Sequence, residues 1–295
     1  MNVLVVGATG HLGLKITREL IAAGAQVRVT HRASSKPEQI AQLRETGAEL
    51  VIADLADSAS LVRACSGVAV VVSAVQGMRD VIVDGQTRLL RAAEQARVSR
   101  MIPSDYALDF FKTPDGGNRN LDLRRELNRA FDGSSVRPTS VLCGAFMDLL
   151  ALGAMGPDPK THVYRVYGDP DQPYDFTLTD DVAKYIAAAA LDTQAPRMLR
   201  VAGDTKSPRE LAAVFEEIWK VPVTLEVAGS VADLDAQIER MRAADEAPAN
   251  PFPLWQRMQY ARDMASGRGL LTPLDNARYS HIQPTTIRDL LARPR

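Results

Sequence analysis

A glycine-rich stretch near the amino terminus contains the residues whose types and spacing have the clearest chemical meaning; residues 7–13 are GATGHLG. Gly7 would permit a tight turn, Gly10 would let backbone N–H groups approach a pyrophosphate, and Gly13 would let the next helix pack closely on the strand. That helix would also direct the positive end of its dipole at the phosphates. A structural turn with incidental glycines is the alternative, but the stretch follows an apolar strand and opens an amphipathic helix. It therefore predicts a dinucleotide-phosphate site with contacts from Gly7, Thr9, Gly10, His11, Leu12 and Gly13.

The end of the second expected strand distinguishes NAD from NADP. An acid there would bind the ribose 2′-hydroxyl of NAD, whereas an arginine would accommodate the 2′-phosphate of NADP. Residues 29–36 are VTHRASSK and include no acid, so Arg32 could offer its planar guanidinium to the phosphate, with Lys36 nearby. The alternative is that Arg32 is only a solvated loop residue. The pattern favours NADP as the cofactor.

Two further strand ends should face the same crevice, because ligands of open α/β sheets bind beyond the carboxyl ends of the strands. Asp54 and Leu55 follow the third strand and could contact the adenine, although Asp54 could equally be the N-cap of the next helix. Residues 73–77 follow the fourth strand, where the chain would run along the nicotinamide ribose. We expect contacts there from Ala74, Gln76 and Gly77.

These residues need a scaffold of strands and helices, and the first hundred residues alternate between the two patterns. Short apolar runs, typical of strands buried on both faces, occur at 3–6, 27–30, 49–53, 68–75 and 100–103. Helical spacing lies between them, as in Leu12, Ile16 and Leu20, and further helices are expected at 80–96, 121–131, 179–191 and 208–219. This alternation predicts an α/β fold, a Rossmann-type doubly wound parallel sheet.

The length of 295 residues is more than one small domain needs, so we expect a second, smaller region. The predicted division is an NADP-binding domain at 1–152, onto which 177–202 would pack back. A smaller, mainly helical substrate region would consist of 153–176 and 203–295, where a proline cluster at 247–253 could form a lid or a tether. Apolar side chains of the carboxyl-terminal half could line a pocket, although each alone is an ordinary core residue: Phe146, Met147, Met155, Phe252, Trp255 and Met258.

Composition and charge exclude several classes of protein. Lys plus Arg number 35 and Asp plus Glu 36, a net charge of −1 without a basic block, so we expect no nucleic-acid binding. Cys65 and Cys143 cannot build a disulfide framework, and the four histidines lack metal-site spacing. No apolar run approaches the roughly 20 residues that span a bilayer, and the first strand begins without a secretory signal. We therefore expect no metal site, no membrane contact and a cytoplasmic protein.

A segment after the fifth strand carries a resemblance to a known family. Residues 102–109 are IPSDYALD, similar to the Pro-Ser-Glu-Phe-Gly-x-Asp signature of isoflavone reductase-like enzymes, with Asp105 for the glutamate and Tyr106 for the phenylalanine. Together with GATGHLG, the basic end of strand two, Gly-Ala-Glu at 47–49 and Asp-Leu at 54–55, this segment resembles the NmrA-like branch of the atypical short-chain dehydrogenases. The resemblance covers about 1–200 and continues weakly through Arg-Tyr at 278–279 and Pro-Thr-Thr at 284–286.

The resemblance implies that the chain binds NADP(H), and we expect Ser104 among the cofactor contacts. Some family members reduce phenylpropanoid or other aromatic substrates, whereas others sense the dinucleotide and act as regulators. The reductases carry a lysine on the helix after the Pro-Ser segment, where it assists proton transfer. This sequence has no lysine between Lys112 and Lys160, and it has no Tyr-x-x-x-Lys pair. The usual proton donor of the family is therefore missing.

Tyr106, Arg124 and Arg125 are the remaining candidates for catalysis. Arginine holds its proton too firmly to act as a general acid near neutral pH, but it could bind and polarise a substrate oxygen. A phenol could donate a proton if nearby arginines lower its pKa. Alternatively, Tyr106 only replaces a packing phenylalanine, and the arginines of 123–129 form the solvated face of a helix.

We expect an NADP(H)-dependent oxidoreductase that transfers a hydride to a small, mostly apolar, aromatic substrate, either phenylpropanoid-like or quinone-like. The alternative, motivated by the missing lysine, is a catalytically weak or inactive NADP(H) sensor with a regulatory role. The enzyme needs a small-molecule substrate, whereas the sensor would act through a protein partner or a homodimer.

Overall fold

The computed structural model describes residues 1–245 and 250–293, so part of the proline cluster at 247–253 lies outside the described residues. The chain divides into two compact units. The first unit consists of Met1–Tyr106, Leu123–Val141 and Val182–Leu199, and the second of Ala107–Asp122, Leu142–Asp181 and Arg200–Arg295. Each unit therefore draws on three separate segments of the chain.

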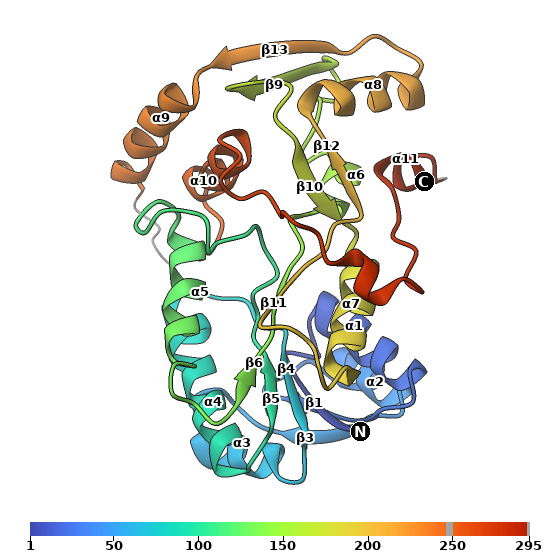
Figure 1. The fold of residues 1–295 in the computed structure, drawn as a ribbon, viewed down its shortest axis with the longest axis vertical. Coiled ribbons are helices and arrows are strands. Elements are labelled where there is room, and N and C mark those ends of the chain that lie inside the picture. The colour runs from blue at the N-terminus through green and yellow to red at the C-terminus, as the bar shows by residue number, and fades with distance from the viewer. Residues whose placement is uncertain (246–249, 294–295) are drawn as a thin grey trace. The chain divides into compact units, whose positions relative to one another are not determined.

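The first unit contains a six-stranded parallel sheet in the order β3-β2-β1-β4-β5-β6 (Figure 1). Its strands are β1 (Asn2–Val6), β2 (Gln26–His31), β3 (Glu49–Ile52), β4 (Val70–Ser73), β5 (Arg100–Ile102) and β6 (Arg137–Pro138). Val3 of β1 pairs with Val27 of β2 on one side and with Val70 of β4 on the other. The strand order reverses between the neighbouring strands β1 and β4, which is the switch point where ligands of such sheets bind. The sheet confirms the predicted Rossmann-type fold.

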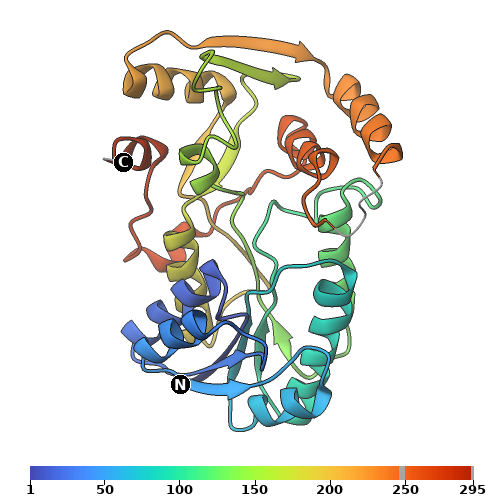
Figure 2. The same ribbon diagram turned by 180° about the vertical axis from the view of Figure 1, so that it is seen from behind.

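Helices cover both faces of this sheet, with α1, α2 and α7 on one face and α3, α4 and α5 on the other (Figures 1 and 2). They are α1 (His11–Ala22), α2 (Pro37–Glu45), α3 (Ser58–Cys65), α4 (Gln86–Gln95), α5 (Arg119–Arg129) and α7 (Thr179–Leu191). Helix α1 buries Ile16 and Leu20 completely, as their helical spacing predicts. A π-helix, η1 (Asp80–Gly85), precedes α4, so the helix expected at 80–96 begins with wider turns.

A buried arginine connects β5 to α7 within the first unit. Arg100 is 3% exposed, and its Nη2 donates hydrogen bonds to the carbonyls of Ala189 and Ala190 at 3.0 and 2.6 Å. These carbonyls belong to the last turn of α7, where the helix leaves acceptors unpaired and its dipole favours a cation. Arg100 therefore caps α7 from the neighbouring strand.

The second unit contains short strands that the sequence analysis did not predict. A three-stranded sheet has the order β12-β10-β8, with β8 (Ala145–Phe146), β10 (Tyr174–Thr177) and β12 (Asp204–Lys206). A parallel pair joins β9 (Val163–Tyr167) to β13 (Thr224–Gly229) (Figure 2). Strands β7 (Ser140–Leu142) and β11 (Met198–Arg200) form another pair, and all but the last residue of each belongs to the first unit.

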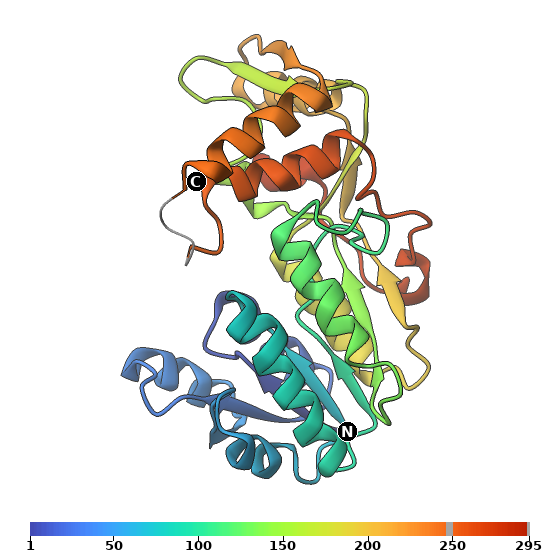
Figure 3. The same cartoon turned by 90° about the vertical axis from the view of Figure 1, so that its left-hand side faces the viewer.

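The helices of the second unit are α6 (Asp148–Ala151), α8 (Pro208–Trp219), α9 (Val231–Ala243), α10 (Leu254–Ala265) and α11 (Ile287–Leu291). Helix α8 begins where the sequence predicts, because Ser207 accepts a hydrogen bond from the Glu210 N–H and Glu210 bonds back to the Ser207 N–H. Helices α9 and α10 lie side by side (Figure 3). A single turn of 3₁₀-helix, η2 (Asn276–Tyr279), lies in the segment between α10 and α11.

The core of the second unit is one cluster of buried apolar residues, which includes Phe110, Phe176 and Phe215. Of the residues considered for a pocket wall, Met147 is fully buried in this cluster and Trp255 is 5% exposed. Phe252 is 38% exposed. Met147 and Trp255 are therefore ordinary core residues.

Between residues 1 and 245 and between 250 and 293, no helix is both long and apolar enough to cross a membrane. In the same two ranges, no three side chains of His, Cys, Asp or Glu lie close enough together to hold a metal ion.

Candidate functional site

The glycine-rich turn after β1 has a geometry that only glycine accommodates at two positions. Gly7 adopts a φ of +86°, and a Cβ atom there would lie 2.5 Å from the carbonyl oxygen of Ala74 at the end of β4. A Cβ atom at Gly13 would lie 2.2 Å from the Gly7 carbonyl oxygen. Helix α1 therefore packs against the turn at a distance that excludes any side chain at Gly13, as the sequence analysis expected.

Gly10 of the same turn serves as the N-cap of α1 and has no side chain with which to cap the helix. The first turn of α1 contains no acidic residue, so the positive end of its dipole is not neutralised by the helix itself. A Cβ atom at Gly10 would be 3.3 Å from the Gly7 carbonyl oxygen, a tight but less severe contact than at Gly7 or Gly13. The turn and helix start, which include Thr9, His11 and Leu12, thus have the features of an anion-binding site.

The loop from β2 to α2 presents two exposed cations, Arg32 and Lys36. Neither side chain forms an ion pair or hydrogen bond with any residue that the structure describes. The loop backbone is held internally: the Arg32 N–H donates to the Ser35 hydroxyl at 3.0 Å, and the Ser35 N–H donates to the Arg32 carbonyl at 3.0 Å. The guanidinium and ammonium groups are therefore available to an external anion.

Gln39 of α2 connects this loop to the glycine-rich turn. Its Nε2 donates a hydrogen bond to the Thr9 carbonyl at 3.2 Å, and its Oε1 accepts one from the Lys36 N–H at 3.3 Å. Gln39 was not among the residues predicted from the sequence. A glutamine at the third helical position, two residues after Pro37, was the available signal for the helix start, but nothing in the sequence indicated the bond to Thr9.

Asp54 and Leu55 follow β3, as expected, but Asp54 is not the N-cap of α3. The N-cap is Asp57, whose Oδ1 accepts hydrogen bonds from the N–H groups of Ala59 and Ser60 at 3.0 and 3.2 Å. These bonds lower the pKa of the Asp57 carboxyl. The N-cap alternative for Asp54 is therefore wrong, because the helix begins three residues later.

The side chains around Asp54 and Leu55 fix their backbone. Asp54 is exposed, and its Oδ1 accepts a hydrogen bond from the Ala56 N–H at 2.8 Å. The Leu55 carbonyl accepts a hydrogen bond from Arg88 at 2.7 Å. A Cβ atom at Gly85 would lie 3.1 Å from the Leu55 side chain, so the last residue of η1 packs closely against Leu55.

The segment after β4 is held from two sides. The Ala74 N–H donates to the Val6 carbonyl at 2.8 Å, and Ser104 donates its hydroxyl to the Val75 carbonyl at 2.7 Å. Ser104 is 4% exposed, and its own N–H donates to Gln86 Oε1 at 3.0 Å. Gln76 is exposed and makes no side-chain hydrogen bond within the described part of the chain. Ser104 therefore holds the loop after β4 in place, whereas the polar atoms of Gln76 bond to no described neighbour.

Tyr106 lies beside the end of β4. It is 8% exposed, and its hydroxyl donates a hydrogen bond to the Ser73 carbonyl at 2.8 Å. A phenylalanine could not make this bond, so Tyr106 does more than fill the space of the family's phenylalanine. As a proton donor to a substrate, Tyr106 would have to break its bond with Ser73.

A buried polar network surrounds Asp105, the residue before Tyr106. Asp105 is fully buried, and its Oδ2 accepts hydrogen bonds from Asn128 Nδ2 at 2.8 Å and from the Ser140 hydroxyl at 2.7 Å. Arg197 donates to Asn128 Oδ1 at 2.6 Å and to Ser140 Oγ at 3.0 Å, so these two residues bridge an anion and a cation. Burial raises the pKa of Asp105, while the hydrogen bonds and the charges of Arg124 and Arg197 oppose that rise.

The two candidate arginines lie on α5. Arg124 and Arg125 are half-buried, and the Arg124 carbonyl accepts a hydrogen bond from Asn128 at 3.0 Å. The next residue, Glu126, accepts a hydrogen bond from Arg79 Nη1 at 2.8 Å and a second one from Nη2. All of the candidate site residues belong to the first unit.

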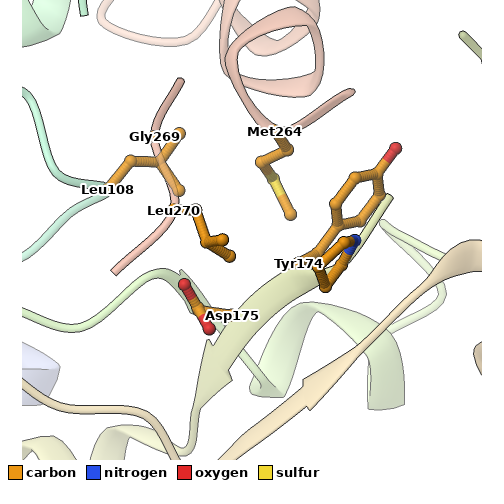
Figure 4. Close-up of a pocket in the computed structure, with 7 residues that line it drawn as sticks. Leu108, Tyr174, Asp175, Met264, Gly269 and Leu270 are labelled. Carbon is orange, nitrogen blue, oxygen red and sulfur yellow. The ribbon is translucent and has the colours of Figure 1, made fainter. Parts of the chain in front are cut away.

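A small pocket occurs within the second unit (Figure 4). Its lining includes Leu108, Tyr174, Asp175, Met264 and Leu270. Asp175 is 4% exposed, and both of its carboxylate oxygens are occupied, one by the Thr205 hydroxyl and the other by the Leu271 N–H, each at 2.7 Å. Burial raises the pKa of this carboxyl. The pocket thus contains a carboxylate that supports the local fold.

The parallel sheet, the glycine-rich turn and the two helix layers define a Rossmann-type α/β protein. The chain belongs to the NmrA-like family, whose model matches residues 1–243.

Three comparisons describe its relatives. The chain is 29% identical over 274 residues to pinoresinol reductase 1 of Arabidopsis thaliana, covering 85% of this chain and 84% of that protein. It is 31% identical over 234 residues to the isoflavone reductase homolog IRL of Zea mays, covering 73% of this chain and 74% of that protein. The solved structure of AtPrR2 with NADP⁺ and (+)pinoresinol has a TM-score of 0.83, covers 99% of this chain and 97% of that chain, and is 24% identical. This similarity shows a common fold.

Proposed function

We propose that this chain is an NADP(H)-dependent oxidoreductase that acts on a small aromatic substrate, phenylpropanoid-like or quinone-like. The observation that carries the proposal is a pair of exposed cations, Arg32 and Lys36, that have no ion-pair partner among the described residues. Their loop is bonded to the glycine-rich turn, where α1 begins without a side-chain cap. An anion-binding turn next to separate cations suits a ligand with a pyrophosphate and a further phosphate. The names of the reductases to which the chain is similar support the same substrate class. The similar solved structure of AtPrR2 contains NADP⁺.

The chain's residues fit this cofactor. The glycine-rich turn and the amino terminus of α1 would hold the pyrophosphate, while Arg32 and Lys36 would bind the 2′-phosphate. Asp54 and Leu55 would lie against the adenine. The segment after β4, with Ala74, Gln76 and Ser104, would bind the nicotinamide ribose. The bound dinucleotide would supply the hydride.

The substrate side of the reaction would depend on Tyr106, Arg124 and Arg125. Either arginine could bind a substrate oxygen and stabilise negative charge on it, since a guanidinium keeps its proton. Tyr106 could give its hydroxyl proton to that oxygen after its bond with the Ser73 carbonyl breaks. This division of roles would replace the missing lysine with two kinds of group.

A turnover screen tests this proposal. Purified protein is incubated with NADPH and a panel of aromatic ketones, enals and quinones, and the loss of NADPH absorbance is followed. We expect consumption with at least one class, and a lower kcat for Tyr106→Phe than for the wild type. Absence of turnover across the panel at high enzyme concentration would overturn the enzymatic proposal.

A second candidate function is NADP(H) sensing, in which the chain binds the dinucleotide and regulates a protein partner. The observation that favours it is the lack of a lysine on α5, together with a Tyr106 hydroxyl whose proton is donated to the main chain. A sensor should bind NADPH without consuming it and should change its affinity for a partner on binding. NADPH turnover at an ordinary enzymatic rate with any metabolite would overturn this second function.

A further inference from the structure

We propose that Gln39 is a specificity-determining positioning residue, which sets the place of the Arg32 and Lys36 loop relative to the glycine-rich turn. This inference rests on the proposed NADP(H) cofactor and adds how the site would select a dinucleotide with a 2′-phosphate. Gln39 would not touch the ligand's phosphate. It would act through the two cations.

The amide of Gln39 has both ends occupied by main-chain partners from different loops. Nε2 donates to the carbonyl of Thr9, which lies 30 residues earlier in the chain, and Oε1 accepts from the N–H of Lys36. The Lys36 carbonyl in turn accepts a hydrogen bond from the Ile40 N–H at 3.1 Å. One side chain therefore joins the glycine-rich turn, the loop of Arg32 and Lys36, and the first turn of α2.

The chemistry of the ligand explains why this connection matters. A pyrophosphate and a 2′-phosphate belong to one dinucleotide, so their binding groups must keep a matching separation. Here the two sets of groups follow different strands, β1 and β2, and the cationic loop is exposed. A loop that is held in its binding position before the ligand arrives loses less entropy on binding. Gln39 would provide that restraint for NADP(H) and would matter little for NAD(H), which lacks the 2′-phosphate.

A purely structural role for Gln39 would be to cap α2. That role needs only Oε1, which accepts the Lys36 N–H in the manner of a capping box. The bond from Nε2 to Thr9 contributes nothing to the helix end. Loss of a cap would lower the stability of α2 and affect both dinucleotides alike, whereas loss of positioning would affect their ratio.

The matched variants are Gln39→Met and Gln42→Met. Both residues lie on α2, and the substitution changes the side chain in the same way at each. Gln42, however, is exposed and forms no side-chain hydrogen bond to any described residue. Dissociation constants for NADPH and NADH are measured by fluorescence titration. One neutral hydrogen bond corresponds to a change of about threefold to tenfold in affinity. We expect Gln39→Met to lower the affinity for NADPH by that factor and the affinity for NADH by less than about twofold. Gln42→Met should change neither affinity.

A double-mutant cycle completes the test. In the Arg32→Ala/Lys36→Ala background, Gln39→Met should no longer change the NADPH affinity, because the groups through which it acts are gone. Equal weakening of both dinucleotides by Gln39→Met, an unchanged ratio, or the same loss in both backgrounds would overturn the inference. A wild type without a preference for NADPH would instead overturn the proposed cofactor, so the two failures are distinguishable.

Discussion

Arg32 and Lys36 of the first unit are exposed and without an ion pair among the described residues, whereas two cations of the second unit share one buried carboxylate. Arg200 donates to Asp109 at 2.7 Å, and Lys112 lies 3.7 Å from the same carboxyl group, which is 0% exposed. The two regions thus use the same residue types differently. Arg200 and Lys112 find their anion within the chain, whereas the two cations proposed to bind a ligand are exposed on a loop with internal backbone hydrogen bonds.

Arg262 of α10 is another cation of the second unit whose anions lie within the chain. Its side chain is 8% exposed and donates hydrogen bonds to Asp263, Asp235 and the Gly117 carbonyl. Burial and hydrogen-bonding partners therefore separate Arg200 and Arg262 from Arg32, which residue type alone cannot do.

The largest effect should follow from Arg200→Ala, because Asp109 would remain buried without its main counterion. Removal of one partner from a buried ion pair costs about 3–5 kcal/mol. Since Lys112 remains near the carboxylate, we expect a loss of about 3 kcal/mol in the free energy of unfolding, measured by urea denaturation. Arg32→Ala should change the same quantity by less than about 0.5 kcal/mol. Comparable losses in the two variants would break the contrast between the regions.

Arg32→Ala should show its effect in binding instead. A charge-assisted contact with a phosphate contributes roughly 1.5–3 kcal/mol, so we expect NADPH affinity to fall at least about tenfold while NADH affinity barely changes. Arg32→Lys should recover only part of the loss, since an ammonium cannot reproduce the planar fork of a guanidinium. Titration of both dinucleotides decides the matter. Equal weakening of both, or a wild type that prefers NADH, would show that Arg32 does not bind the 2′-phosphate.

Lys112 of the second unit and Lys36 of the first unit should differ in the same way, but with a smaller effect on the free energy of unfolding. Lys112 is 34% exposed, and its Nζ donates hydrogen bonds to the carbonyls of Leu270 and Thr272, each at 2.9 Å. Lys112→Met should therefore lower the free energy of unfolding by about 1 kcal/mol, and Lys36→Met by less than about 0.5 kcal/mol. Thermal or urea unfolding of both variants measures the difference. A larger loss for Lys36→Met would mean that the exposed loop contributes to stability.

A rise in ionic strength tests the role of the exposed cations without any mutation. We expect it to produce the smallest of these changes. Interactions of exposed charges are screened as the Debye length falls from about 10 Å at 0.1 M to about 3 Å at 1 M ionic strength. Over that range we expect NADPH to lose roughly threefold more affinity than NADH, because NADPH alone would engage Arg32 and Lys36 through a 2′-phosphate. Parallel titrations at the two salt concentrations provide the measurement. An identical salt dependence for both dinucleotides would contradict the proposed role of the loop.

The sequence predicted the first unit well because its signals are local. Buried parallel strands appear as continuous apolar runs, and the glycines at 7 and 13 are required by contacts with the turn itself and with the neighbouring strand β4. The strands β9, β10, β12 and β13 were missed. They are short, and β9 and β13 pair although Val163 and Thr224 are far apart in the chain. Propensity in such short segments is overridden by tertiary context.

Site details that depend on distant partners could not be predicted. The bond from Tyr106 to the Ser73 carbonyl spans 33 residues, and that from Gln39 to Thr9 spans 30. Nothing in the residue types indicates which main-chain oxygen a side chain will find. The choice of Asp57 over Asp54 as N-cap was a smaller failure, because both are acids just before the helix and only the backbone path distinguishes them.

The cap that Arg100 places on α7 has a consequence for synthesis of the chain on the ribosome. The acceptors of its guanidinium, the carbonyls of Ala189 and Ala190, are up to 90 residues later in the sequence. At about 5–20 residues per second, translation takes roughly 5–20 s to reach them after Arg100 is added. During that interval the residues of β5 have been synthesised but those of α7 have not. The second unit's segments Ala107–Asp122 and Leu142–Asp181 are also made before the first unit is complete. Both units therefore remain incomplete at the same time during synthesis, and we expect amino-terminal fragments that stop before α7 to depend on chaperones more than the full-length chain does.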